Sequence, residues 1–237
     1  KDPKFFDRIV EDFHACGYIG EDQNLLMGYL IASSRKLHNP LSFLVISRSA
    51  AGKTSLQDAI LSFIPEEDVI AYTRLTDQAL FYQDENALYG KVLAIEEEAG
   101  AQGAGYALRS VAMTSKSLRT GSTIKDPVSG KLKNKDTLVK LRTAVFVTTT
   151  KQSLSFETIN RFILATIDES QSQTEKILAW QRRLCGSEGY LLRKRRKELI
   201  RLHQDSQRLF VTDLEVTNPF VGALTFTAKT LRARREQ

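Results

Sequence analysis

The stretch that decides the fold is LSFLVISRSAAGKTSLQDAILSFI, residues 41–64 of the chain. Its first six residues, 41–46, are nearly all apolar, as expected for a central strand of a parallel sheet. Residues 47–54 are small or polar, and residues 55–64 have helical periodicity up to Pro65. A small-residue loop between a strand and a helix lets backbone N–H groups surround phosphate oxygens. The sequence therefore predicts a phosphate-binding loop here.

Two side chains of this loop have the chemistry that a nucleoside triphosphate requires. Lys53 is expected to reach the β and γ phosphates, and the hydroxyl of Thr54 is expected to bind Mg²⁺. The positive N-terminus of the next helix points to the same place. One residue departs from the pattern GxxxxGK[ST], because Ser47 stands where the first glycine belongs.

An acidic run follows a second apolar strand. Residues 91–95 (KVLAI) predict a buried strand that continues directly into Glu96, Glu97 and Glu98. Phosphoryl transfer to water needs one acid to hold Mg²⁺ and another to polarise the attacking water. Our first assignment gives the metal to Glu96 and the water to Glu97. The pair Glu97 and Glu98 is the alternative.

Two further residues are candidates for the same reaction. The strand predicted at residues 143–149 is expected to lie between the loop strand and the acidic strand, so Thr150 at its tip can hold the attacking water. Arg161 precedes the strand predicted at residues 162–167. From that position it can project from one subunit onto the γ-phosphate held by a neighbour, as an arginine finger does.

The excess positive charge is confined to two segments. The chain has 237 residues, with 34 basic and 28 acidic side chains and a net charge of +6. Residues 116–142 hold eight basic and two acidic residues, and residues 181–208 hold nine and three, so each segment carries +6 and the remainder −6. Such segments are candidate polyanion-binding surfaces, or else a lysine-rich hairpin and a solvated helix face.

Composition excludes several other classes of protein. No apolar run approaches the roughly 20 residues that a membrane span needs, so no membrane partner is expected. Cys16 and Cys185 are far apart with no CxxC, which predicts reduced thiols in a cytoplasmic protein. Three scattered histidines are too few for a zinc cluster. The chain begins at Lys1 without methionine, as expected for a piece of a longer protein.

Strands that alternate with helices predict an α/β fold with a central, mostly parallel sheet. We divide the chain into an N-terminal helical linker (1–40), an α/β core (41–170) with a hairpin insertion (118–141), and a helical, basic C-terminal region (171–237). The remaining predicted elements are two helices within 1–39, a strand at 69–73, a helix at 78–82, a helix at 106–117, a hairpin turn at 126–130, and helices from 171 onward broken at 186–189.

These motifs, taken in order, resemble AAA+ ATPases. More closely, they resemble the helicase modules of primase-helicase proteins from mobile elements and phage-like replicons, which are related to minichromosome-maintenance helicases. The segments that carry the resemblance are SRSAAGKTSL, DQALFY, KVLAIEEEAG, YALRS, GSTIKDPVSGKL, VFVTTT and TINRFILATIDE, within residues 24–170, and TNPFVGALTF with LRARRE near the end.

The resemblance implies a P-loop NTPase fold of the AAA+ type with a partial C-terminal helical lid, ATP and Mg²⁺ as ligands, and a homo-oligomeric ring, a hexamer in the full-length protein. The residues that it implies for the nucleotide loop are Ser49, Ala50, Ala51, Gly52, Lys53, Thr54 and Ser55. It implies that Lys125, Lys131, Lys133 and Lys135 on the hairpin face a single DNA strand in the pore. It also suggests Arg234 or Arg235 as a second sensor. Threonine in place of the usual sensor asparagine, and the glutamate triplet, depart from the family pattern.

Three functions are compatible with these features. The first is an ATP-driven DNA helicase or translocase, whose lysine hairpin grips the backbone without reading bases. The alternative is an AAA+ nucleotide switch or loader that binds ATP and DNA or a protein partner without unwinding. The third is a non-hydrolysing interaction module with a degenerate loop. Intact Lys53, Thr54 and paired glutamates argue against the third function.

Overall fold

The computed structural model describes residues 3–73, 79–97, 117–125, 132–150, 159–212, 217 and 219–223. The helices are α1 (Phe5–Ala15), α2 (Asp22–Ser33), α3 (Lys53–Ser62), α6 (Gln171–Cys185) and α7 (Gly189–Arg208), with short 3₁₀ helices η1 (Ser34–Lys36), η2 (Glu66–Asp68), η3 (Ala79–Tyr82) and η4 (Val221–Ala223). The strands are β1 (Ser42–Ile46), β2 (Val69–Tyr72), β3 (Tyr89–Glu97), β4 (Ser117–Lys125), β5 (Leu132–Lys140), β6 (Arg142–Thr149) and β7 (Ile163–Ala165).

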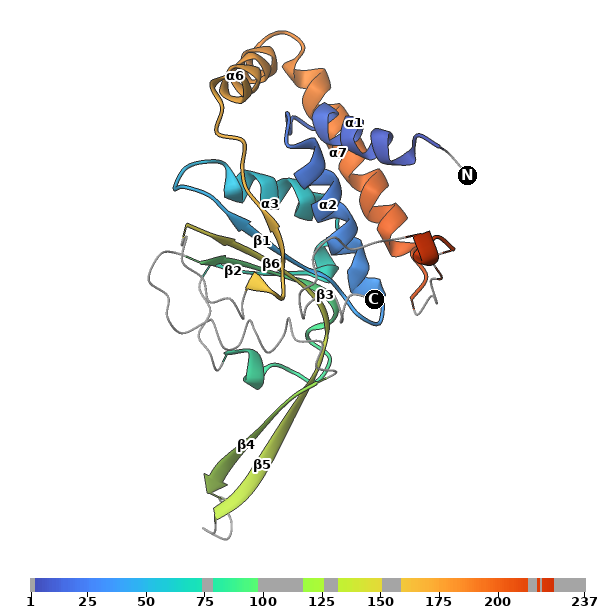
Figure 1. Cartoon of the computed structure of the whole chain (residues 1–237). Coiled ribbons are helices and arrows are strands. Elements are labelled where there is room, and N and C mark those ends of the chain that lie inside the picture. The colour runs from blue at the N-terminus through green and yellow to red at the C-terminus, as the bar shows by residue number, and fades with distance from the viewer. Residues whose placement is uncertain are drawn as a thin grey trace.

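Five strands form a central sheet in the order β2-β3-β6-β1-β7, and every neighbouring pair is parallel. Helices cover this sheet, as Figure 1 shows for α2, α3 and α7. The fold is therefore the α/β P-loop fold that the sequence predicts. The expected position of the strand before Thr150 is also confirmed, because β6 lies between β1 and β3.

Some predicted elements differ from the observed ones. The acidic strand is longer than predicted, since β3 includes Glu96 and Glu97. Residues 79–82 form a 3₁₀ helix rather than a longer helix. Ser117, predicted to end a helix, begins strand β4. The rest of that predicted helix and the turn at 126–130 lie outside the described residues.

Alternate residues of the strands point to opposite faces of the sheet, and each face has its own buried cluster. Val92 and Ala94 of β3 pack into the cluster on the side of α1, α2 and α3. Leu93 and Ile95 pack into the other cluster, under η3 and the base of the hairpin. This alternation fixes the face to which each residue at the end of β3 belongs.

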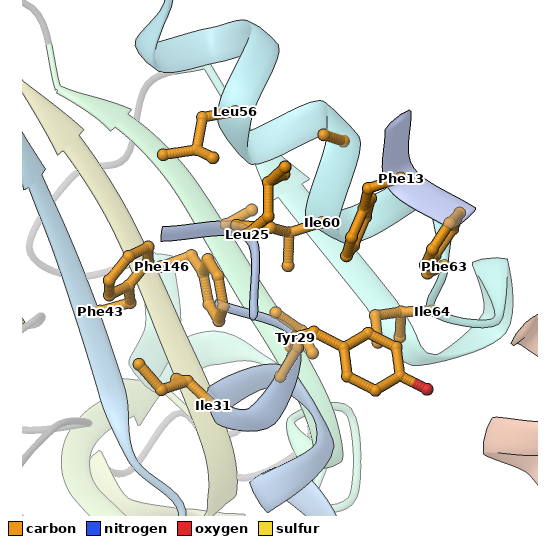
Figure 2. Packing of buried hydrophobic residues seen from close by; sticks show 14 of the residues in the cluster. Phe13, Leu25, Tyr29, Ile31, Phe43, Leu56, Ile60, Phe63, Ile64 and Phe146 are labelled. Carbon is orange, nitrogen blue, oxygen red and sulfur yellow. The ribbon is translucent and has the colours of Figure 1, made fainter. Parts of the chain in front are cut away.

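The N-terminal helices share the core of the α/β unit. The rings of Phe13 in α1 and Phe63 after α3 stack with centroids 4.1 Å apart, and Figure 2 shows them side by side. Helix α2 comes close to α3 at Gly28, where an added Cβ would lie 2.2 Å from the Cδ1 atom of Ile60. Glycine is therefore required at this helix contact, despite its cost of about 1 kcal/mol in a helix interior.

Helix α7 packs against the same cluster. Its His203 ring stacks on Phe63 with centroids 4.0 Å apart, and its Nε2 lies 3.0 Å from a carboxylate oxygen of Asp12. Burial lowers the pKa of His203, and the Asp12 carboxylate opposes that shift. The first and last described helices are therefore held together through the core.

A buried arginine joins the flanking helices to the edge of the sheet. Arg35 is fully buried and donates from Nη2 to the carboxylate of Asp68, 2.9 Å away. Its Nη1 donates to the side-chain oxygen of Gln207 in α7, 2.8 Å away. Below we call Arg35, Asp68 and Gln207 the arginine clamp.

The hairpin β4–β5 leaves the sheet between β3 and β6 and projects away from it (Figure 1). Its base is fixed by Leu118 and Val139, which are buried in the core. Lys140 forms an ion pair with Glu85, 2.8 Å away. The predicted hairpin insertion is therefore present.

Two other observations bear on the expected class of protein. Within the described ranges, no helix combines the length and the apolar character that crossing a bilayer requires. Cys16 is buried and Cys185 is exposed, and both are free thiols.

Candidate functional site

The phosphate loop connects β1 to α3 and contains two left-handed residues. Ala50 has φ +62° and Gly52, the residue that caps α3, has φ +99°. An added Cβ at Gly52 would have no atom within 4 Å, so the backbone there is open on one side. A loop of this kind, followed by a helix N-terminus, suits phosphate oxygens.

Ala50 is unusual because a residue with a Cβ rarely adopts φ near +60°. We expect Ala50→Gly to raise the free energy of unfolding by about 1 kcal/mol, since glycine has no Cβ to strain. Ala51→Gly is the matched control, because Ala51 has no positive φ and should lose about 0.5–1 kcal/mol. Urea denaturation measures both changes. Equal destabilisation by the two variants would contradict the left-handed assignment.

The ammonium group of Lys53 folds back over the loop. It donates to the carbonyl oxygen of Ser47 at 3.1 Å and to the carbonyl oxygen of Arg48. The backbone N–H of Ser47 in turn donates to the carbonyl oxygen of Thr149 at the end of β6, 3.3 Å away. The loop is thus tied to the neighbouring strand on the side of the acidic residues.

The register of the sheet brings the loop, the β6 tip and the acidic strand end to one edge. Thr149 is paired with Ile46 of β1 on one side and with Glu97 of β3 on the other. Strands lie about 4.8 Å apart, so the ends of β1 and β3 are separated by roughly 10 Å. Thr150, the next residue of the chain, is half-buried and level with Ser47. These positions are close enough to contact one bound triphosphate.

Glu96 belongs to the face of the sheet that α3 covers. It follows Ala94 at the period of two, and Ala94 packs into the cluster on the α3 side. Desolvation, and after it the Glu96 carboxylate, raise the pKa of Asp58. Asp58 lies one helical turn after Thr54 on α3, so both occupy one face of that helix. Glu96 and Thr54 therefore have the placement and the oxygen ligands that Mg²⁺ prefers.

The side chains of Glu97 and Glu98 are outside the described part of the chain. The backbone of Glu97 is the last residue of β3, level with Thr149. Its assignment to the attacking water stays a prediction, and so does the alternative pair with Glu98.

Arg161 is not brought to the loop of its own chain. Ile163 of β7 is paired with Phe43 of β1, which makes Arg161 level with Leu41, six residues before Ser47. At about 3.3 Å per residue, Arg161 lies roughly 20 Å from the loop along the strand direction, near the opposite edge of the sheet.

The four predicted DNA-binding lysines are only partly located. Lys125 ends β4 and is paired with Leu132, whereas Lys133 and Lys135 lie on β5, paired with Ile124 and Ser122. Lys131 lies outside the described residues, as do Arg234 and Arg235. The backbone thus places three of the lysines on the distal part of the projecting hairpin.

The second basic segment forms the outer surface of α6 and α7. Lys194 and Lys197 are exposed, and neither forms an ion pair with a residue of the described ranges. Arg208 differs, because it pairs with Glu67 at 2.8 Å. Most of this segment is therefore a solvated basic helix face.

A cavity of about 270 Å³ adjoins the phosphate loop. Ala51, Gly52 and Ser55 line it on the loop side, and Ile177 and Trp180 of α6 line the opposite side. Residues 17–21, between α1 and α2, complete the wall. The mainly apolar lining, with few polar groups, is typical of a small-molecule site.

Contacts between α6 and residues 17–21 shape this cavity. The side-chain amide of Gln173 donates to the carbonyl oxygen of Ile19. At Gly17, where φ is +96°, an added Cβ would lie 2.6 Å from Nε1 of Trp180. The sequence reasoning missed this wall. The signals were the glycines at 17 and 20 in a short helix connection and the single tryptophan on an otherwise polar helix.

Comparison with known proteins places the chain in a known group. A family model described as the MTBMA_p00010 P-loop domain matches residues 7–202. The matched range runs from α1 into α7 and includes the phosphate loop, the acidic strand end and the hairpin. A comparison with curated proteins finds no match.

Proposed function

The chain belongs to the MTBMA_p00010 P-loop domain family, and from this premise we propose that it is an ATP-driven DNA helicase or translocase module that hydrolyses ATP between subunits of a homo-oligomeric ring. The observation that carries the proposal is the order β3-β6-β1 at one sheet edge. It aligns the acidic strand end, the threonine tip and the phosphate loop. A nucleotide-binding P-loop domain needs the last of these, whereas hydrolysis needs all three.

Each residue at this edge has a distinct proposed role. Lys53 binds the β and γ phosphates, together with the backbone N–H groups of residues 49–55. Thr54 and Glu96 hold Mg²⁺, which when bound neutralises the charge that develops on the phosphate oxygens. Glu97 accepts a proton from the attacking water, and Thr150 orients that water.

The adjoining cavity is the proposed site of the nucleoside. It is continuous with the loop through Gly52 and Ser55, so a phosphate chain on the loop can extend its base and sugar into the cavity. Trp180 lines the cavity and is the single tryptophan of the chain. Its fluorescence therefore reports nucleotide binding without a label.

The location of Arg161 supports a site shared between subunits. It lies near the sheet edge opposite its own loop, roughly 20 Å away, and cannot act there. A guanidinium that stabilises the transition state must then come from another copy of the chain. We propose that copies assemble head to tail, in a ring of six in the full-length protein, so that Arg161 of one completes the site of the next.

The hairpin is the proposed contact with single-stranded DNA. We expect the double charge reversal Lys131→Glu and Lys133→Glu to weaken single-stranded DNA binding on all sequences alike. The slope of log affinity against log salt should become shallower by about 1.4, because two phosphate contacts are lost at about 0.7 each. Fluorescence anisotropy over a salt series measures both effects.

The matched control for this experiment is Lys194→Glu with Lys197→Glu on α7, which changes the net charge equally at a distant exposed surface. A similar loss from both pairs would indicate a general charge effect, and a loss confined to one DNA sequence would contradict backbone contact by the hairpin.

Two measurements on the full-length protein test the proposed function. ATP turnover is expected to rise when single-stranded DNA is added, and strand displacement is expected to require ATP. Turnover or binding without displacement would favour the alternative, an AAA+ nucleotide switch or loader. Absence of nucleotide binding, followed through Trp180 fluorescence and calorimetry, would contradict both.

A further inference from the structure

We propose that Glu169 is a positioning residue for the phosphate loop and that it acts through Ser47. The inference rests on the proposed binding of ATP at this loop. Glu169 follows β7, the strand next to β1, and therefore lies at the same sheet edge as the loop. Its carboxylate accepts a hydrogen bond from the Ser47 hydroxyl at 2.6 Å.

The same carboxylate contacts the next residue of the loop twice. Its Oε1 accepts the backbone N–H of Arg48 at 3.4 Å. Its Oε2 lies 3.7 Å from Nε of the Arg48 side chain. Both Arg48 and Glu169 are partly or largely exposed, so the ion pair itself contributes little. The two hydrogen bonds to Oε1 are therefore the contacts that fix the first turn of the loop.

Ser47 connects this carboxylate to the lysine that binds phosphate. Its hydroxyl donates to Glu169, its N–H donates to Thr149, and its carbonyl oxygen accepts from Lys53. A single residue thus joins β6, the end of β7 and the lysine side chain. Movement of Ser47 would displace the carbonyl group that Lys53 contacts.

This arrangement explains why serine is accepted where the pattern has glycine. Ser47 has no positive φ, so its Cβ causes no backbone strain. Its hydroxyl gains a partner that glycine lacks. We infer that the pair of Ser47 and Glu169 replaces the usual first glycine as the device that sets the path of the loop.

The carboxylate also brings a negative charge to a site for phosphates. The hydrogen bond from Ser47 is the main cause of the lowered pKa of Glu169, which is therefore ionised at neutral pH. Its role as an acceptor and its charge can be separated, because glutamine keeps a carbonyl oxygen but carries no charge.

The test compares four variants with the wild type: Glu169→Ala, Glu169→Gln, Ser47→Ala and the double alanine variant. We expect Glu169→Ala to raise the KM for ATP about 10-fold, the loss of one good hydrogen bond of about 1.4 kcal/mol, with kcat changed less than about twofold. Ser47→Ala should do the same, and the double variant should be no worse than either. Glu169→Gln should have a KM at or below that of the wild type.

Glu175→Ala is the matched control, because it removes an exposed carboxylate of α6 that bonds to Gln171 and does not contact the loop. Its KM should equal that of the wild type. A glutamine variant as impaired as the alanine variant, additive effects of the two alanine substitutions, or an unchanged KM for Glu169→Ala would each overturn the proposal.

Hydrogen exchange at the Arg48 amide tests the contact without nucleotide. We expect exchange to be faster in Glu169→Ala and close to wild type in Glu169→Gln. Equal exchange in all variants would overturn the positioning role. If the wild-type protein shows this exchange pattern but binds no ATP, the proposed function fails and the contact stands.

Discussion

Lys53→Ala is expected to lower the affinity for ATP by at least about 100-fold. The side chain makes two contacts with loop carbonyl groups, to Ser47 and Arg48, and these hold its charge over the loop. Phosphate oxygens would replace the carbonyl groups as acceptors of charge-assisted hydrogen bonds. Such bonds contribute about 1.5–3 kcal/mol each, and two of them correspond to 100-fold or more. Calorimetric titration with ATP measures the loss.

Lys194→Ala on α7 is the matched control, since it removes an exposed lysine far from the loop in sequence. It should bind ATP as the wild type does. Thermal unfolding of Lys53→Ala should remain close to wild type, because the lysine contributes only two exposed or half-buried contacts. Retained ATP affinity in a folded Lys53→Ala protein would refute the assignment of the loop.

Glu97→Gln is expected to leave ATP binding intact and to lower kcat by a factor of roughly 10²–10⁴, the usual contribution of a general base. Glu97 ends β3, level with Thr149 and two strands from the loop. Arg161→Ala should lower kcat by a comparable or larger factor, as the loss of an arginine finger does, without affecting binding. Steady-state ATPase assays and Trp180 fluorescence separate turnover from binding.

Mixing these two inactive variants tests the shared site. In a head-to-tail ring, an interface is complete when an Arg161→Ala subunit supplies Glu97 and a Glu97→Gln subunit supplies Arg161. Random mixing in equal amounts should restore about a quarter of the interfaces. The absence of any recovery, in a sample whose mass in solution confirms mixed oligomers, would argue against a site completed in trans.

If Glu98 rather than Glu97 serves the water, the result differs in a defined way. Glu98→Gln would then lose turnover and Glu97→Gln would lose metal dependence instead. The pair of variants therefore decides between the two assignments that the glutamate triplet leaves open.

The strands of the sheet were predictable because their sequences are unambiguous. Residues 41–46 and 143–149 are continuous apolar runs, which suit strands buried on both faces, and β1 and β6 match them within one residue. The middle position of β6 followed from the need to place a polar tip between loop and acids. Helix α3 begins at Lys53, two residues earlier than its periodicity indicates, because Gly52 caps it.

The cavity and the partner of Ser47 could not be predicted by the same means. Trp180 meets Gly17 across more than half of the chain, and Glu169 meets Ser47 over a similar interval. Local periodicity contains no information about such contacts, since they depend on how helices pack. A short apolar run also misled the prediction at residues 162–167, where β7 covers only three residues because it pairs with β1 alone.

The arginine clamp has a consequence for how this protein can be taken apart. A charge with no exposed surface tolerates the loss of its counter-ion poorly, and breaking a buried pair costs about 3–5 kcal/mol. Asp68 sits in the α/β part of the chain, whereas Arg35 and Gln207 come from the stretches on either side. The nucleotide unit therefore cannot be excised or transplanted as an autonomous module, and its two flanks should melt together with it as one cooperative block.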